Sequence, residues 1–286
     1  MRYCGREFTV VEVKEINQLI TANPKANRSA LSRYVCELLD WYRHDGRLKD
    51  MSCRVAMLRM HEDGLLQLPP PGNGNNNGKP YTRRSNQTAP KLSPVVISPE
   101  KFSDLQLFPV LKKDDSHLWN EYIQRYHYLG YAPIPGDQIR YIAKFHQQEV
   151  AMLSFRAAVW KTAPRDQFIG WNIQQRKRNL HLIINNARFL ILPWVKSPNL
   201  ASRLLSMISK RVKDDWQQLY GYSPVLMETF VETPRFLGTC YKAANWQYLG
   251  KTKGLGRLAK TNIPKLPIKE IYIYPLKKRF RNKLCC

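Results

Sequence analysis

The chain has 286 residues, 43% of them hydrophobic, so it is long enough to enclose a full core and to hold more than one domain. It carries 46 Lys and Arg against 22 Asp and Glu, and the resulting formal net charge of +24 indicates a polyanionic partner, most commonly a nucleic acid. No apolar stretch approaches the roughly 20 residues that cross a bilayer, and the first residues resemble no secretory signal, so we expect a soluble, cytoplasmic protein without membrane contact.

The basic residues are unevenly distributed along the chain. Residues 1–68 contain 11 basic and 9 acidic residues, whereas residues 91–286 contain 32 basic and 13 acidic residues. The C-terminal part is therefore expected to form the main basic surface.

Residues 1–68 are expected to form a small helical domain. Apolar residues recur there at helical spacing in three stretches, and the run after Gly64, residues 65–69, predicts a wing strand. This pattern favours a helix-turn-helix or winged-helix module that offers cations to a DNA groove. A helical bundle that docks a protein is the alternative, because the segment is nearly neutral. The apolar stripes are Val13, Ile16, Leu19 and Ile20; Leu31, Tyr34, Val35, Leu38, Leu39 and Tyr42; and Met51, Val55 and Leu58, and the cations are Lys49, Arg54 and Arg59.

Residues 69–92 have the composition of a flexible linker. They contain a triple proline, a run rich in Gly and Asn, and few apolar side chains, so they cannot enclose a core. A coil of this length spans roughly 25 Å on average. The remaining residues, 93–286, are expected to form an α/β body with a basic C-terminal tail.

Alternation and helical spacing predict a mixed sheet flanked by helices in this body. A helix at 116–123 precedes two hairpin strands at 138–145 and 150–155. Apolar strands at 189–193 and 225–231 enclose a helix that carries Leu200, Leu204, Leu205, Ile208 and Val212, with Ser197 as its expected cap, and such a crossover implies a parallel strand pair. A last strand is expected at 268–274.

The stretch 157–178 interleaves cations with aromatic residues, as single-stranded or distorted nucleic acid would require. The tail, residues 250–286, adds 11 basic residues and one acidic residue, and Gly254 begins a flexible turn suited to phosphate contact. The DNA-contacting residues expected in the body are Lys161, Arg165, Trp171, Arg176, Lys177, Arg178, Arg188, Lys251, Lys253 and Arg257.

Glu228 is the most informative acidic residue, because it lies in a strand that should be buried. The catalytic candidates are Glu228, Asp166 and Tyr241, which we expect in a cleft with Arg156 and Arg188. A nuclease built on these carboxylates would require Mg²⁺. The alternative is a salt bridge from Glu228 to Arg188 or Arg156.

Several other chemistries lack their sequence requirements. The chain has no GxxxxGK[ST] phosphate loop, and its six cysteines and six histidines show neither disulfide nor zinc spacing. We expect free thiols, no resident metal and no identified cofactor.

Five ordered blocks of the sequence closely resemble the DruA family of the Druantia anti-phage defence system. They lie at 127–131, 165–171, 185–194, 228–231 and 238–246, within a resemblance that covers roughly residues 100–275. The resemblance implies a bacterial protein that acts on or around DNA, in defence beside helicase-like subunits or in mobile elements, since related domains accompany DDE-type transposases. It supplies no reaction.

The order of elements also resembles the GNAT acyltransferase fold, and Tyr241 matches the position of the tyrosine that serves there as an acid. The turn that would meet the cofactor pyrophosphate, residues 195–200, has no glycine, and Pro198 removes an amide donor. Acyl-CoA binding is therefore disfavoured. Two classes of function remain: a DNA-binding defence component, or a DNA-processing enzyme such as a nuclease or strand-transfer factor.

Overall fold

The computed structural model describes residues 1–43, 45–72, 84–134, 136–255, 263–264 and 266–286. Its chain divides into two compact units, Met1–Asn77 and Gly78–Cys286. Within the described ranges, no helix is both long enough and apolar enough to cross a bilayer.

The first unit contains the three expected helices, α1 (Val10–Ala22), α2 (Arg28–Leu38) and α3 (Asp50–Glu62), after a short hairpin of β1 (Arg2–Tyr3) and β2 (Arg6–Glu7). A capping box between Thr9 and Glu12 starts α1. The wing strand expected at 65–69 is absent, because Leu66 and Leu68 bury their side chains in the helical core from an irregular segment. A winged helix is therefore not confirmed.

The expected apolar stripe of α3 was wrong. Met51, Val55 and Leu58 are 54%, 38% and 37% exposed, and the buried face consists instead of Cys53, Ala56, Met57 and Met60. Both sets recur at helical spacing. Val and Leu are the more hydrophobic residues, but the core of this unit is filled from α3 by small and flexible side chains.

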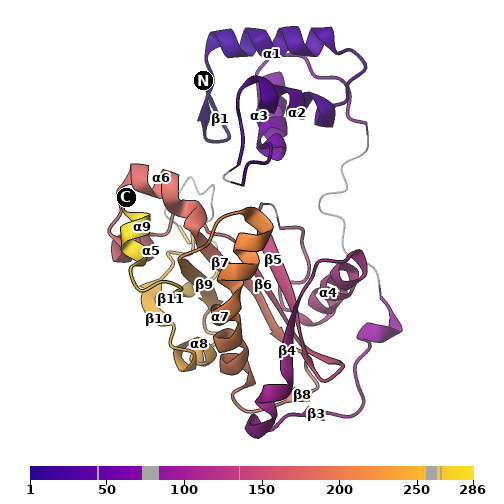
Figure 1. Ribbon diagram of the computed structural model, residues 1–286, viewed down its shortest axis with the longest axis vertical. Helices are drawn as coiled ribbons and strands as arrows, with labels where there is room; N and C mark the ends of the chain where they lie inside the picture. The colour runs from indigo at the N-terminus through magenta and orange to yellow at the C-terminus, as the bar shows by residue number, and fades with distance from the viewer. Residues whose placement is uncertain (44, 73–83, 135, 256–262, 265) are drawn as a thin grey trace. The chain divides into compact units, whose positions relative to one another are not determined.

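The second unit is built on a seven-stranded mixed sheet (Figure 1). Its strands are β4 (Leu105–Pro109), β5 (Gln138–Phe145), β6 (Gln148–Ala157), β7 (Ile183–Ile191), β9 (Leu226–Glu232), β10 (Gln247–Lys251) and β11 (Lys269–Pro275). Their order is β10-β11-β9-β7-β6-β5-β4, and all neighbours are antiparallel except β7 and β9. A small parallel pair joins β3 (Val95–Val96) to β8 (Val195–Lys196).

The expected crossover between β7 and β9 is confirmed. Helix α7 (Leu200–Tyr220) joins the two strands, and it buries the five apolar residues that predicted it. Its N-cap is Asn199 at φ 62°, without a side-chain cap, and not Ser197. Asn tolerates this left-handed conformation, so the turn closes without a glycine.

The two faces of the sheet carry different helices. Tyr141 donates to Asp215 of α7 over 2.8 Å, whereas its neighbour Arg140 donates to Asn120 of α4 (Lys113–Tyr126) over 2.9 Å. Since successive strand residues point to opposite faces, α7 and α4 cover opposite sides. We call these sides the α7 face and the α4 face.

The stretch expected as a basic aromatic segment folds into two short helices, α5 (Ala163–Ile169) and α6 (Ile173–Asn179). The tail ends in α9 (Phe280–Leu284), and α8 (Thr239–Ala243) follows β9. Short 3₁₀ helices complete the unit at Asn86–Thr88, Pro99–Asp104 and Leu180–Leu182. The predicted fold class, a mixed α/β sheet flanked by helices, is confirmed, although β7 begins six residues before the expected strand.

Met60→Ala should destabilise the first unit far more than Leu58→Ala. Met60 is 0% exposed, and emptying such a site costs about 2–5 kcal/mol, whereas Leu58 is 37% exposed. Amide hydrogen exchange across α1–α3 in the full chain measures both changes. A larger effect from Leu58→Ala would contradict the observed face of α3.

Candidate functional site

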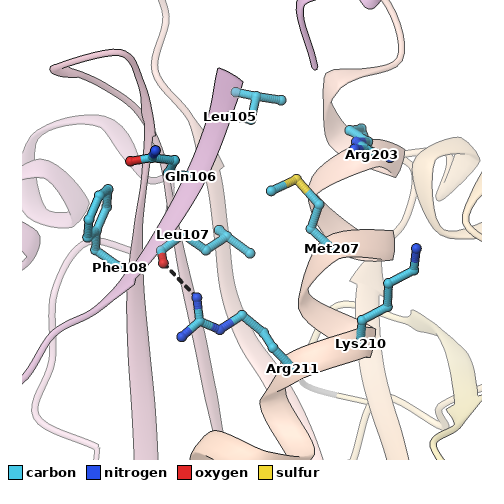
Figure 2. Close-up of a pocket in the computed structure, with 8 residues that line it drawn as sticks. All are labelled: Leu105, Gln106, Leu107, Phe108, Arg203, Met207, Lys210 and Arg211. Carbon is cyan, nitrogen blue, oxygen red and sulfur yellow. Dashed lines mark hydrogen bonds between the residues drawn. The ribbon is translucent and has the colours of Figure 1, made fainter. Parts of the chain in front are cut away.

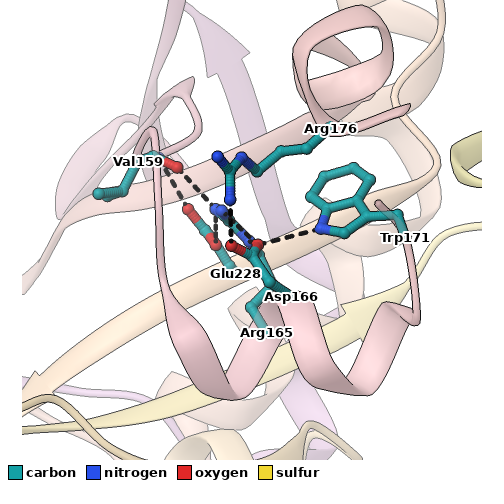
Figure 3. A network of polar contacts seen from close by, with 6 residues as sticks. All are labelled: Val159, Arg165, Asp166, Trp171, Arg176 and Glu228. Carbon is teal, nitrogen blue, oxygen red and sulfur yellow. Dashed lines mark hydrogen bonds and ion pairs between the residues drawn. The ribbon is translucent and has the colours of Figure 1, made fainter. Parts of the chain in front are cut away.

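Glu228 lies on the α4 face of β9, where it is fully buried and forms an ion pair. Arg165 of α5 donates from Nη1 to Glu228 Oε2 over 2.9 Å, and both side chains are 0% exposed. The backbone N–H of Val159 donates to the other carboxylate oxygen over 3.0 Å (Figure 3). A salt bridge was the expected alternative to catalysis, and one is present. Its partner is Arg165, however, and neither Arg156 nor Arg188.

Asp166 extends this pair into a network that also fixes α6. Its Oδ1 accepts from Nε and Nη2 of Arg165, at 3.0 and 2.9 Å, and from the Trp171 indole at 3.1 Å. Its Oδ2 accepts from Arg176 Nη1 over 3.1 Å (Figure 3). Two guanidinium groups therefore balance two carboxylates. We name these residues, Arg165, Asp166, Arg176 and Glu228, the ion network.

The ion network is built to hold elements together. A buried charge is stable when its partners satisfy all of its hydrogen-bonding positions. Removing one partner then leaves an uncompensated buried charge. Both oxygens of Glu228 have donors inside the protein. This geometry supports a structural role for Glu228 and Asp166, namely the attachment of α5 and α6 to the sheet.

Tyr241 does not join Glu228, although both were expected in one cleft. Its hydroxyl donates to Asn186 Oδ1 over 2.7 Å and accepts from Thr229 at 3.4 Å. Asn186 and Thr229 directly follow Asn185 and Glu228 in their strands, so Tyr241 lies on the α7 face. Burial raises the pKa of the Tyr241 hydroxyl.

Arg156 and Arg188, the other members of the expected cleft, do lie on the same face as Glu228. The register pairs Arg156 with Asn185 and Asn185 with Glu228, and it pairs Ser154 with Arg188. Burial lowers the pKa of Arg156, although the charge of Glu228 opposes this effect. Burial and the like charge of Arg156 lower the pKa of Arg188. His127 lies near this pair, and burial followed by the charge of Arg188 lowers its pKa to about 4.

The C-terminal tail packs against α6. The side chain of Asn179 donates to the backbone oxygens of Leu284 and Cys286, both at 3.1 Å. Gln175 also bonds the Cys285 carbonyl, and Phe280 stacks on Phe168 with ring centroids 5.9 Å apart. Figure 1 shows α5, α6 and α9 as one group. The tail was expected to be a cationic end. Its apolar residues Phe280 and Leu284, at helical spacing, are the signal in the sequence that it packs on the rest of the unit.

These segments carry eight exposed cations, and we call the surface that they contribute the α6–α9 face. Its exposed members are Lys161, Lys177, Arg178, Lys277, Lys278, Arg279, Arg281 and Lys283. The acidic residue within residues 157–182 and 277–286 is Asp166, which the ion network already neutralises.

Two residues expected to contact DNA are buried instead. Arg165 is 0% exposed and Trp171 is 8% exposed, since both serve the ion network. The exposed aromatic residue of this segment is Trp160, which is 51% exposed and has the Arg176 guanidinium 5.5 Å from its ring centre.

The remaining cations expected to contact DNA lie in several places. In the first unit, Arg54 donates to Ser29 over 2.8 Å and pairs with Asp50, while Lys49 is half-buried and Arg59 is exposed. Lys251 and Lys253 are exposed at the end of β10, which contacts α5. Arg257 lies outside the described residues.

A hollow of about 480 Å³ lies apart from all of these residues, between β4 and α7 (Figure 2). Leu105, Phe108, Met207 and Lys210 line it, and Arg211 crosses its floor to donate to the Leu107 carbonyl over 2.7 Å. Among the described residues, no three His, Cys, Asp or Glu side chains lie close enough together to form a metal site.

Glu228→Gln should destabilise the second unit by about 3–5 kcal/mol, because Asp166 would remain as the single carboxylate between the guanidinium groups of Arg165 and Arg176, and one charge of the network would stay uncompensated. Thermal unfolding of the full chain measures the loss. Glu232→Gln on the same strand is the matched control, since its partner Arg235 is 54% exposed and such pairs contribute at most about 1 kcal/mol. Equal effects of the two changes would contradict the structural role of the ion network.

Several solved structures that match part of this chain are acetyltransferases. AAC(6')-Ib in complex with ribostamycin and coenzyme A is 11% identical, with a TM-score of 0.41 over 63% of this chain and 96% of that chain. The ribosomal-protein-S18-alanine N-acetyltransferase from Escherichia coli is 7% identical, with a TM-score of 0.37 over 60% and 94%. An N-acetyltransferase from Staphylococcus aureus Mu50 is 11% identical, with a TM-score of 0.36 over 60% and 97%.

Comparison with curated proteins gave no match. The family model for the Druantia protein DruA matches residues 61–264, which is more than half of the chain and includes β4 to β10 and the ion network. The family suggests a component of a Druantia defence system. The chain belongs to the DruA family.

Proposed function

We propose that this protein is the DNA-binding component of a bacterial Druantia anti-phage system, and that it holds the phosphate backbone against the α6–α9 face. The observation that carries the proposal is the set of eight exposed cations in residues 157–182 and 277–286, where the one acidic residue, Asp166, is already neutralised. A positively charged surface attracts polyanions, and nucleic acid is the commonest polyanion.

The rest of the α6–α9 face fits this partner. Lysine and arginine contacts to phosphates position a protein on DNA without reading its sequence. Trp160 offers an exposed ring on which an unpaired base could stack, as in proteins that bind single strands. Lys251 and Lys253 extend the positive charge along β10, next to α5.

The first unit is better suited to a protein partner than to a DNA groove. Met51, Val55 and Leu58 expose an apolar stripe on α3, and Arg54 is already bonded to Ser29 and Asp50. We propose that this unit contacts another subunit of the same defence system, which the family resemblance implies is helicase-like.

A DNA-processing enzyme is the alternative proposal, as a Mg²⁺-dependent nuclease or a strand-transfer factor. It requires carboxylates that are free to bind a metal or a proton, and the ion network occupies Glu228 and Asp166. The turn before α7 does not favour acyl-CoA binding, because Pro198 and Asn199 occupy positions where a phosphate-binding turn would have glycines. Binding without chemistry is therefore the function that we favour.

Replacing Lys177, Arg178 and Lys278 together with Gln should weaken binding to duplex and single-stranded DNA and flatten its salt dependence. Each lost phosphate contact reduces the slope of log K against log salt by about 0.9 on duplex DNA, so three contacts reduce it by about 2–3. Fluorescence anisotropy across a salt series, with and without magnesium, measures both properties, and gels of the same samples report cleavage.

The matched control replaces Lys101, Lys112 and Lys113 with Gln. These exposed lysines precede or begin α4, and none belongs to the α6–α9 face. If the control lowered the salt slope as much as the α6–α9 variant does, the charge effect would be general, and the proposed face would be wrong. Cleavage that depends on magnesium would favour the enzyme alternative.

A further inference from the structure

Three buried polar atoms on neighbouring strands of the α4 face lack a hydrogen-bond partner among the described residues. They are Ser154 Oγ, Arg156 Nε and Asn185 Nδ2. Ser154 and Arg156 are two positions apart on β6, and Asn185 lies directly opposite Arg156 on β7, so all three belong to one face. Buried polar groups in folded proteins are almost always bonded, and a cluster of exceptions indicates a missing ligand.

Two guanidinium groups join this cluster without an ion-pair partner among the described residues. Arg188 is the register partner of Ser154, and Arg188 and Arg156 are close enough to repel each other. No carboxylate of the described residues lies within 4.0 Å of either group. The nearby Glu228 is already bonded to Arg165 and Val159, so it offers no free oxygen.

Every group in the cluster can donate a hydrogen bond, and its charge is positive. Arginine stays protonated at any physiological pH, so the repulsion between the two groups cannot be relieved by loss of a proton. An anion relieves it. A phosphate group fits better than a carboxylate, because its three or four oxygens accept from several donors at once and its charge matches two arginines.

We propose that Arg156 and Arg188, with Asn185 and Ser154 beneath them, form a binding site for one phosphate group. The proposal deepens the proposed function and rests on it only for the source of the phosphate, a DNA strand. Both arginines are half-buried, so the site is open to solvent on one side while its floor is closed.

The rim of the site favours a nucleotide as the source. Tyr128 lies within electrostatic reach of Arg188 and is 38% exposed. Its ring is held by Phe236, at 5.2 Å between centroids, and by the Arg235 guanidinium at 4.8 Å. His127 also stacks on this ring, at 4.8 Å between centroids. A base attached to the bound phosphate would therefore meet the exposed part of the Tyr128 ring, and stacking on aromatic side chains tolerates any base.

Titration calorimetry of the full chain with inorganic phosphate, at moderate salt, tests the site without DNA. Arg188→Gln and Arg156→Gln should each weaken phosphate binding by tenfold or more, the effect of one lost charged hydrogen bond. Arg203→Gln on α7 removes the same charge from the opposite face and should change binding less than twofold. Equal affinity for Arg188→Gln and Arg203→Gln would overturn the site.

Arg188→Lys covers the case in which a Gln variant fails to fold. It keeps the charge but loses the planar fork, so weakened phosphate binding with an unchanged circular dichroism spectrum is expected. Wild-type affinity in Arg188→Lys together with Arg156→Lys would contradict a site that depends on guanidinium geometry.

A 12-nucleotide single strand without terminal phosphates identifies the source. Tyr128→Ala should weaken binding of this strand by about tenfold and leave binding of inorganic phosphate unchanged. If no DNA binds while phosphate binding still depends on Arg188, the DNA function fails and the site stands. If DNA binding depends on Lys177, Arg178 and Lys278 but not on Arg156 or Arg188, the site fails and the DNA function stands.

Discussion

The ion pair between Arg165 and Glu228 is the interaction on which the arrangement of the second unit depends. Both side chains are excluded from water, so breaking the pair would leave the Glu228 carboxylate in the interior without its counter-charge. Through Asp166 the pair fixes Arg176 of α6, and through Asn179 and Gln175 the same helix holds α9. A chain of polar contacts thus runs from the middle of the sheet to the basic surface, and the internal charges cancel while the outer charges remain.

The parallel pairing of β7 and β9 decides which residues can cooperate. It sets Asn185 beside Glu228 on one face and Asn186 beside Thr229 on the other. Tyr241 belongs to the second set, and the arginines Arg156 and Arg188 belong to the first. The α4 face therefore combines a neutral network with an adjacent pair of uncompensated cations, which is a suitable setting for an anion.

The sequence predicted the sheet and its crossover well, because continuous apolar strands and the amphipathic helix at Leu200–Val212 are strong periodic signals. It also predicted the excess of basic residues in the second unit, because this excess can be counted directly from the residues. It could not predict the partner of Glu228, because Arg165 is 63 residues away on a helix too short to show a period. It also misplaced the buried face of α3, where Cys, Ala and Met fill the core, and it joined Tyr241 to Glu228 because strand register is not visible in one sequence.

Amide hydrogen exchange of the Glu228→Gln variant tests the central claim most directly, with Glu232→Gln as the reference. If the ion pair holds α5, α6 and α9 on the sheet, exchange should accelerate in peptides that cover residues 163–179 and 280–284 and stay unchanged in α7. Unchanged exchange in those peptides, or equal acceleration throughout the second unit, would contradict the account.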